Sequence, residues 1–268
     1  MMFLLVPFLV AFFSISAAEP LKKEEPIRLR PVGKTPEPES TSVSIVLPKN
    51  QSVVNSNQIW TQVRVDGYAI GTQSQFDRAD EIVGSKLGQT IHVVVDNDPY
   101  FAINEPAIDP FTEEGWYYDT SYKFTLPMKL KPGAHLLRVF LARSYGECLK
   151  GDKTFFTTIF YVDKKTPLEF NLSQPFLTYN EPSNELYLIE SKPVLLDFYL
   201  SNCDLTSDGY KVRLTIDENT TRLITSWQPY YIYGLKKGKH TIQLELIDRS
   251  GKVVPSPLNT VKREITIH

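Results

Sequence analysis

The chain has 268 residues, of which 29 are basic and 31 acidic, so its formal net charge is −2 at pH 7. This balance provides no overall electrostatic field that would steer the chain toward nucleic acid or anionic lipid, and no nucleic-acid partner is expected. The length is sufficient for two β-sandwich domains of roughly 100 to 120 residues each.

The N-terminal segment 1–18 contains no charged side chain and has an apolar centre, Phe3 to Phe13, followed by small residues. This pattern predicts a secretory signal peptide that is cleaved after Ala18. The alternative is an uncleaved anchor, because the segment approaches the length of a membrane-spanning helix. We therefore expect an exported chain, periplasmic, secreted or at the cell surface, without a stable membrane span after cleavage.

The next segment, 19–42, is rich in proline and charged residues and holds five prolines but only four large aliphatic residues. Such a composition cannot bury enough apolar surface to offset the entropy of ordering the chain. We therefore predict a disordered or extended tether.

Beyond the tether, short β-branched and aromatic runs alternate with clusters of Pro, Gly, Asn and Asp, which predicts an all-β chain. The expected units are a domain over 43–163, a linker over 164–167 and a second domain over 168–268. The clearest strands are His135 to Ala142 and His240 to Ile247, because every second residue in each is suited to a buried face. Further strands are expected over Thr154 to Val162 and Thr260 to Ile267.

An internal repeat supports two copies of one module. Equivalent residues recur at an offset of 105, namely Gly133 and Gly238, His135 and His240, and Gly146 and Gly251. We expect the glycines to allow turns and each histidine to hold its turn through a side-chain hydrogen bond. Copy one carries two insertions, near 67–88 and 99–119, and loops on a rigid sandwich are where binding surfaces are usually built.

Each copy also has an apolar strand that ends in aspartate, at Asp96 and Asp217, followed by Leu-x-x-Gly-x-His, an alternating strand and a glycine turn. This arrangement resembles the tandem immunoglobulin-like, fibronectin type III-like domains of exported bacterial proteins. The resemblance implies two tandem antiparallel β-sandwiches. It also implies functions such as spacer, adhesin stalk, carbohydrate-binding accessory or chaperone-like subunit.

The second insertion contains the candidate binding residues. Its aromatic side chains suit an exposed platform for a sugar face or a protein, and they are Tyr100, Phe101, Trp116, Tyr117 and Tyr118. The acidic side chains of this insertion and of the turn before it could supply oxygen ligands to calcium, although their spacing is not that of an EF-hand: Asp96, Asp98, Asp109 and Glu113. No other cofactor is expected. The structural alternative is that the aromatics fold inward and the acids are solvated.

The two cysteines, Cys148 and Cys203, fall in different predicted domains. In domains stacked end to end they would lie on the order of 35 to 40 Å apart, far beyond disulfide reach. We therefore expect no disulfide within the chain, and free thiols or an intermolecular bond instead. Pairing between the domains would require them to fold back on one another.

The sequence contains no nucleophile elbow, no metalloprotease motif, no phosphate-binding loop and no Cys-x-x-Cys. The leading hypothesis is a non-catalytic exported interaction or scaffold protein that binds a protein partner through the loops of its first domain. A carbohydrate-binding accessory module that uses the aromatic loop is the first alternative. An envelope enzyme of unrecognised type is the second.

Overall fold

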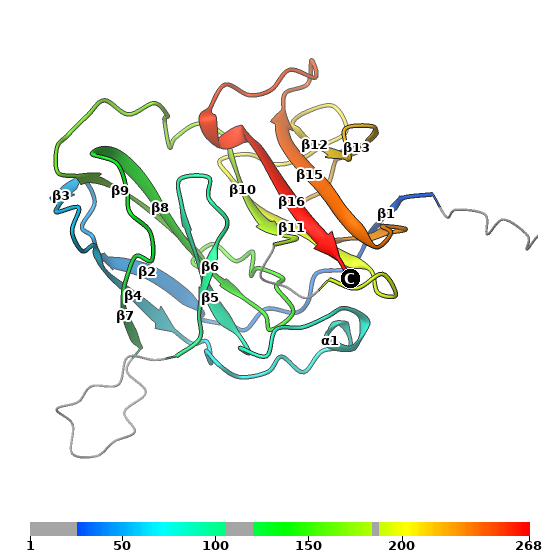
Figure 1. Cartoon of the computed structure of the whole chain (residues 1–268), viewed down its shortest axis with the longest axis horizontal. Helices are drawn as coiled ribbons and strands as arrows, with labels where there is room; N and C mark the ends of the chain where they lie inside the picture. Colours follow the sequence, from blue (N-terminus) through cyan, green and yellow to red (C-terminus); the bar gives the residue numbers. More distant parts are fainter. Residues whose placement is uncertain (1–25, 106–119, 184–187) are drawn as a thin grey trace, which may run out of the picture.

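The structure is a computed structural model, and it describes residues 26–105, 120–183 and 188–268. The described chain is almost entirely β-structure, with one short helix, α1 (Arg78–Glu81), and one 3₁₀ turn, η1 (Pro257–Asn259). The strands form two β-sandwiches that lie side by side, domain 1 on the left of Figure 1 and domain 2 on the right. The predicted all-β fold class is confirmed.

Domain 1 has a three-stranded and a five-stranded sheet. The first has the order β2 (Ser42–Leu47), β4 (Trp60–Asp66), β7 (Ser121–Thr125). The second has the order β3 (Ser52–Val54), β9 (Phe155–Val162), β8 (Gly133–Ala142), β5 (Thr90–Val95), β6 (Phe101–Ile103). Side chains from the facing strands fill the core between the two sheets, among them Val63, Val93, Val139 and Phe160.

Domain 2 has two four-stranded sheets. One has the order β1 (Arg28–Pro31), β14 (Tyr230–Tyr233), β11 (Val194–Ser201), β10 (Phe176–Glu181). The other has the order β13 (Thr220–Ile224), β12 (Lys211–Ile216), β15 (Gly238–Ile247), β16 (Thr260–Ile267). Its core joins both sheets and includes Leu196, Phe198, Leu214 and Leu244.

Two features differ from the predicted layout. The segment expected to be a disordered tether contributes β1, which pairs with β14 of domain 2. Two of its side chains also reach domain 1, since Thr35 bonds to Glu147 and Glu37 accepts from the amide of Lys150. Composition alone does not predict that this segment is ordered, because its partners are distant in the sequence. They are strand β14 of domain 2 and the 143–150 turn of domain 1. The second difference is that β3 pairs with β9 in parallel, in a sandwich expected to be antiparallel.

The two repeated strands differ in how many faces they bury. In β15 the expected alternation holds, with Ile242, Leu244 and Leu246 buried and the residues between them partly exposed. In β8 both faces are buried from His135 onward. The outward residues of β8 are covered because domain 2 packs against this sheet.

Three apolar clusters span the junction between the domains. The first joins Tyr100, Phe140 and Cys148 to Tyr199, and the second joins Leu136 and Ile159 to Phe176 and Leu258. The third lies around the first insertion and contains Ile82, Tyr145, Leu195 and Tyr231. The described parts of both insertions therefore contribute to the packing of domain 1 against domain 2.

Candidate functional site

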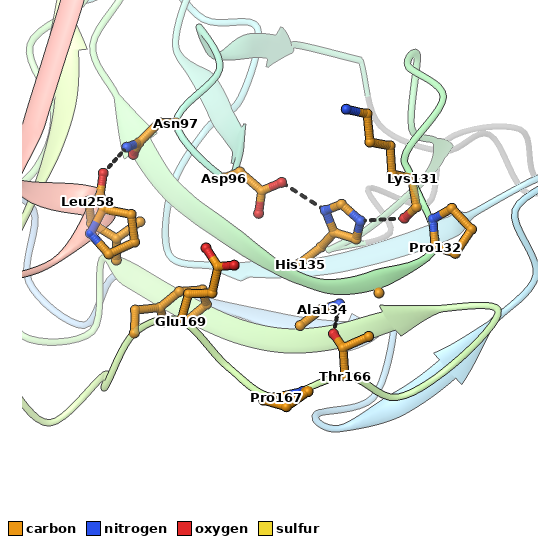
Figure 2. Close-up of a pocket in the computed structure, with 13 residues that line it drawn as sticks. Asp96, Asn97, Lys131, Pro132, Ala134, His135, Thr166, Pro167, Glu169 and Leu258 are labelled. Carbon is orange, nitrogen blue, oxygen red and sulfur yellow. Dashed lines mark hydrogen bonds and ion pairs between the residues drawn. The ribbon is translucent and has the colours of Figure 1, made fainter.

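A pocket of about 360 Å³ opens where the linker, the start of β8 and η1 meet (Figure 2). Prolines and Phe170 form much of its apolar wall, and Asp96, Lys131 and Glu169 bring charged groups to it. Its volume is within the range of small-ligand pockets. Within the described residues, this pocket also contains the first of the two repeated histidines, His135.

Hydrogen bonds at both ring nitrogens fix His135. Its Nδ1 lies 2.7 Å from Oδ2 of Asp96, and its Nε2 lies 2.8 Å from the carbonyl oxygen of Lys131. The other oxygen of Asp96 accepts from the amide of Leu136 at 2.9 Å. The bond to Asp96 raises the pKa of His135 above its ordinary value, against the opposing effect of partial burial.

His240 makes the same bonds in domain 2. Its Nδ1 lies 2.7 Å from Oδ2 of Asp217, and its Nε2 lies 2.8 Å from the carbonyl oxygen of Lys236. The preceding glycines also match, with φ of 135° at Gly133 and 131° at Gly238, a region that L side chains avoid. In both domains the histidine ring bridges an aspartate carboxylate and a backbone carbonyl oxygen, an arrangement called the histidine clamp. Because His240 forms this clamp without lining the pocket of Figure 2, the clamp explains both histidines without a ligand.

The clamp also determines what His135 can do chemically. Both ring nitrogens face acceptors, so the imidazole donates twice when it is protonated and offers no free lone pair. A general base needs such a lone pair within reach of a nucleophile. The geometry of the pocket therefore favours a structural role for the His135–Asp96 pair.

Replacing His135 by alanine should lower the free energy of unfolding by about 1 to 2 kcal/mol, since charge-assisted hydrogen bonds are lost at a partly exposed site. Because the folded pKa is raised, the contribution is fully present below the unfolded value near pH 6.5 and is lost as pH rises through the folded pKa. Urea unfolding at several pH values measures it. A difference between wild type and His135→Ala that grows with pH would contradict this assignment.

The aromatic platform predicted from the sequence is not assembled as expected. Tyr100 is 4% exposed, stacks on His92 with ring centroids 3.6 Å apart, and donates to Oε1 of Glu181 at 2.5 Å. Phe101 is partly buried and contacts Phe124 edge to face. Both rings pack inward because β6 and its preceding turn lie between the core of domain 1 and domain 2. The other three members, Trp116, Tyr117 and Tyr118, lie outside the described residues.

The calcium candidates are also only partly described. Asp96 uses both carboxylate oxygens to hold His135 and Leu136, and Asp98 lies beyond it at the surface. Asp109 and Glu113 lie outside the described residues. Among the residues that the structure does describe, no group of three or more His, Cys, Asp or Glu side chains is placed to hold a metal ion.

The environment of Cys148 shows that the two domains do not stack end to end, in contrast to the expectation from the sequence. Cys148 is buried at the junction, where its thiol lies 3.9 Å from the carbonyl oxygen of Phe198 in domain 2. Cys203 is partly buried against the core of domain 2, and both are free thiols. Burial, together with the charge of Asp197, raises the pKa of Cys148 well above its ordinary value, so this thiol is poorly suited to nucleophilic chemistry.

Sequence reasoning missed the buried charges at the junction. Lys150 donates to Oδ1 of Asp197 at 2.6 Å, and the side chains are 3% and 0% exposed. The second oxygen of Asp197 accepts from the amide of Cys148 and from Asn180, each at 2.8 Å. Burial alone would lower the pKa of Lys150, but the neighbouring Asp197 holds it above its ordinary value. The one sequence signal was the charge of Asp197 within an otherwise apolar strand.

Arg138 is a second buried charge on the same surface. It is 1% exposed, and it donates to Thr178 of domain 2 at 2.8 Å and to the carbonyl oxygen of Asp96. Its sequence context, an arginine between Leu137 and Val139 on the outward face of β8, resembles an ordinary solvent-facing position. The side chain is buried only because domain 2 covers this face of β8.

No protein-family model matches the chain, and comparison with curated proteins gives no match. Among solved structures, the chain is similar to the fibronectin(III)-like modules of CbhA from Clostridium thermocellum, with 13% identity and a TM-score of 0.28 over 84% of this chain and 93% of that one. It is also similar to SGBP-B of the mixed-linkage glucan utilization locus of Bacteroides ovatus, with 12% identity and a TM-score of 0.22 over 85% and 70%.

A third similar structure is the β-glucuronidase of Parabacteroides merdae, with 7% identity and a TM-score of 0.25. The match covers 85% of this chain but only 25% of the enzyme. All three TM-scores lie below 0.5, so the fold described above rests on the strands and cores of this chain itself. Within the described ranges, no helix has the length and apolar character needed to cross a membrane.

Proposed function

We propose that this chain is a non-catalytic exported interaction module whose two sandwiches act as one rigid body. The observation that supports this most directly is the junction, where apolar clusters and fully buried, hydrogen-bonded charges join the domains. Relative motion would expose Lys150 and Asp197 or leave them unpaired, at a cost of several kcal/mol. A fixed geometry suits a scaffold that holds partners at a set distance.

The absence of catalysis is part of this proposal. The His135–Asp96 pair is the arrangement in the described chain that most resembles a catalytic dyad. Both ring nitrogens of His135 are already engaged in hydrogen bonds within the clamp. Its copy at His240 argues for the same structural role. An enzyme of this type would need a free base and a nucleophile together in a cleft.

We further propose a protein partner that binds through the second insertion of domain 1. Tyr100 anchors the start of this insertion in the junction, so any binding surface would come from residues beyond it. A deletion of 109–118 should abolish partner capture and leave the two-domain unit folded. Unchanged capture by the folded deletion variant would reject the insertion as the binding site.

Rigidity has its own test in solution. NMR relaxation of backbone amides should give one rotational correlation time for both domains, and urea unfolding should show one transition for probes in each domain. Two separate correlation times would reject the rigid-body proposal. This result does not depend on whether a partner has been identified.

The pocket of Figure 2 favours one alternative, a glycan-binding accessory module. The carboxylate of Asp96 is fixed by two bonds and yet its side chain is 44% exposed, so it can accept further hydrogen bonds from hydroxyl groups. Phe170 offers an apolar wall beside it. Glycan-array binding that is lost in Phe170→Ala would support this alternative, and a silent array would count against it.

A further inference from the structure

Three separate stretches of chain bring lysines to the end of domain 1 that carries β3. Figure 1 shows β3 at the left of that domain. The strand pairings bring the turn after β2, the loop between β7 and β8, and the linker after β9 to the same end, since Trp60 pairs with Thr125 and Gly133 with Val162. The exposed lysines here, named the lysine end, are Lys49, Lys129, Lys131, Lys164 and Lys165.

Few acidic groups balance this charge. In the described part of the chain, no ion pair involves these five ammonium groups. Lys165 lies over the ring of Tyr161, at 5.6 Å. Asp163 is the acid among these turns, and one of its oxygens accepts from the amide of Ser56. Two further acids, Asp96 and Glu169, line the pocket of Figure 2, as Lys131 does.

Exposed apolar side chains lie at the same end. Trp60 at the start of β4 is 58% exposed, Val53 on β3 is 48% exposed, and Leu47 at the end of β2 is 37% exposed. Val46, beside Leu47, is 41% exposed. Large apolar side chains that cluster on a surface mark an interaction site. The alternation of Ile59 to Val65 already places Trp60 outward, with Gln62 and Arg64.

We propose that the lysine end, with Trp60 as its main apolar anchor, docks on an anionic lipid surface. The charge complementarity is direct, because each lysine near such a surface adds about fivefold to binding. Tryptophan favours the boundary between headgroups and acyl chains, and the aliphatic side chains beside it can enter that boundary. A hydrated acidic polysaccharide would satisfy the lysines but would leave Val46, Leu47 and Val53 in water.

The orientation of the domains fits this role. Domain 2 packs on the β8 sheet of domain 1, and β3 lies at the side of domain 1 away from domain 2 (Figure 1). Of the five lysines, Lys131 also lines the pocket shared with Pro257 and Leu258 of domain 2. Docking there would leave domain 2 projecting from the surface. The inference goes beyond the proposed function, because it concerns where the module sits and does not depend on its partner or its rigidity.

The test is vesicle sedimentation with the chain from Glu19 onward, which removes the apolar segment 1–18 as a source of lipid binding. Vesicles of phosphatidylcholine alone are compared with vesicles containing about one third phosphatidylglycerol, at low and high salt. We expect binding to the anionic vesicles only, weakened by salt. The fluorescence of Trp60 should shift to shorter wavelength on binding.

Two variants make the test specific. Reversal of three charges, Lys49→Glu, Lys129→Glu and Lys164→Glu, should lower binding about 100-fold or more, since each lysine adds about fivefold. The matched control reverses Lys86, Lys237 and Lys252 elsewhere on the surface, with the same change in net charge, and should bind as wild type does. Trp60→Ala should lower binding about fivefold and remove the fluorescence shift.

Equal binding to neutral vesicles, or equal loss in the control variant, would overturn the proposal. So would capture of soluble polygalacturonate without vesicle binding, which would assign the surface to an acidic polysaccharide instead. Circular dichroism of each variant confirms that the sandwiches are intact.

Discussion

Replacing Asp197 by asparagine should destabilise the chain by about 3 to 5 kcal/mol, the largest effect expected from a single substitution here. Asparagine keeps the size of the side chain but removes the charge that faces Lys150 at 2.6 Å. The ammonium group would then stay buried without a counter-ion, while the amide of Cys148 would still find an acceptor. Urea unfolding at neutral pH measures the loss.

An exposed pair provides the control. Lys239 and Glu264 lie 2.8 Å apart with side chains 74% and 58% exposed, and Glu264→Gln should change stability far less than Asp197→Asn does. The double variant Asp197→Asn with Lys150→Met should regain much of the loss, because no buried charge remains. If Asp197→Asn were as mild as Glu264→Gln, the pair would not be buried in solution.

Acid should loosen the junction through His92, with a loss of roughly 3 kcal/mol between pH 6.5 and pH 4. Burial lowers the pKa of His92 to about 4, against a raising effect from Asn180. The Nδ2 of Asn180 already donates to Gly146 and Asp197, so its Oδ1 accepts from Nδ1 of His92 at 2.8 Å. The neutral ring stacked on Tyr100 is therefore the form that the junction accommodates.

Between pH 6.5 and pH 4 the unfolded chain binds a proton that folded His92 does not, so stability is complete above pH 6.5 and falls as pH drops toward 4. The comparison is with His92→Gln, which does not titrate but can still donate to Asn180. Stability curves of the two proteins should diverge in this window, and parallel curves would contradict the assignment.

The strands of both sandwiches could be predicted because their evidence is local. The alternation in 240–247 and the repeated Gly-x-His turns depend on neighbouring residues. Strands β8 and β15 begin at the repeated glycines, two residues before the predicted starts at His135 and His240. The repeat also carried a signal that alternation alone misses. Where copy two has Thr241 and Glu245, copy one has the apolar Leu136 and Phe140, which indicates that the outer face of β8 is covered.

The candidate site could be predicted much less well. Tyr100 looks like an exposed aromatic in a loop, and its burial depends on Glu181 of domain 2, which is far from it in the sequence, and on stacking against His92. The insertions were expected to bind partners because loops often do, whereas their described parts fill the space between the domains. Which surface a loop meets depends on the packing of the domains.

The sequence by itself determined two copies of one β-sandwich module, because strand alternation and turn glycines are local properties of the chain. Only the tertiary structure decided that the copies pack side by side, that residues 28–31 join the second domain, and that Lys150 faces Asp197. It also decided that lysines spread over the chain gather at one end of domain 1, although the total charge is nearly balanced. Contacts between residues that are distant in the sequence depend on which surfaces pack together and exclude water. The pattern of neighbouring residues does not specify which surfaces these are.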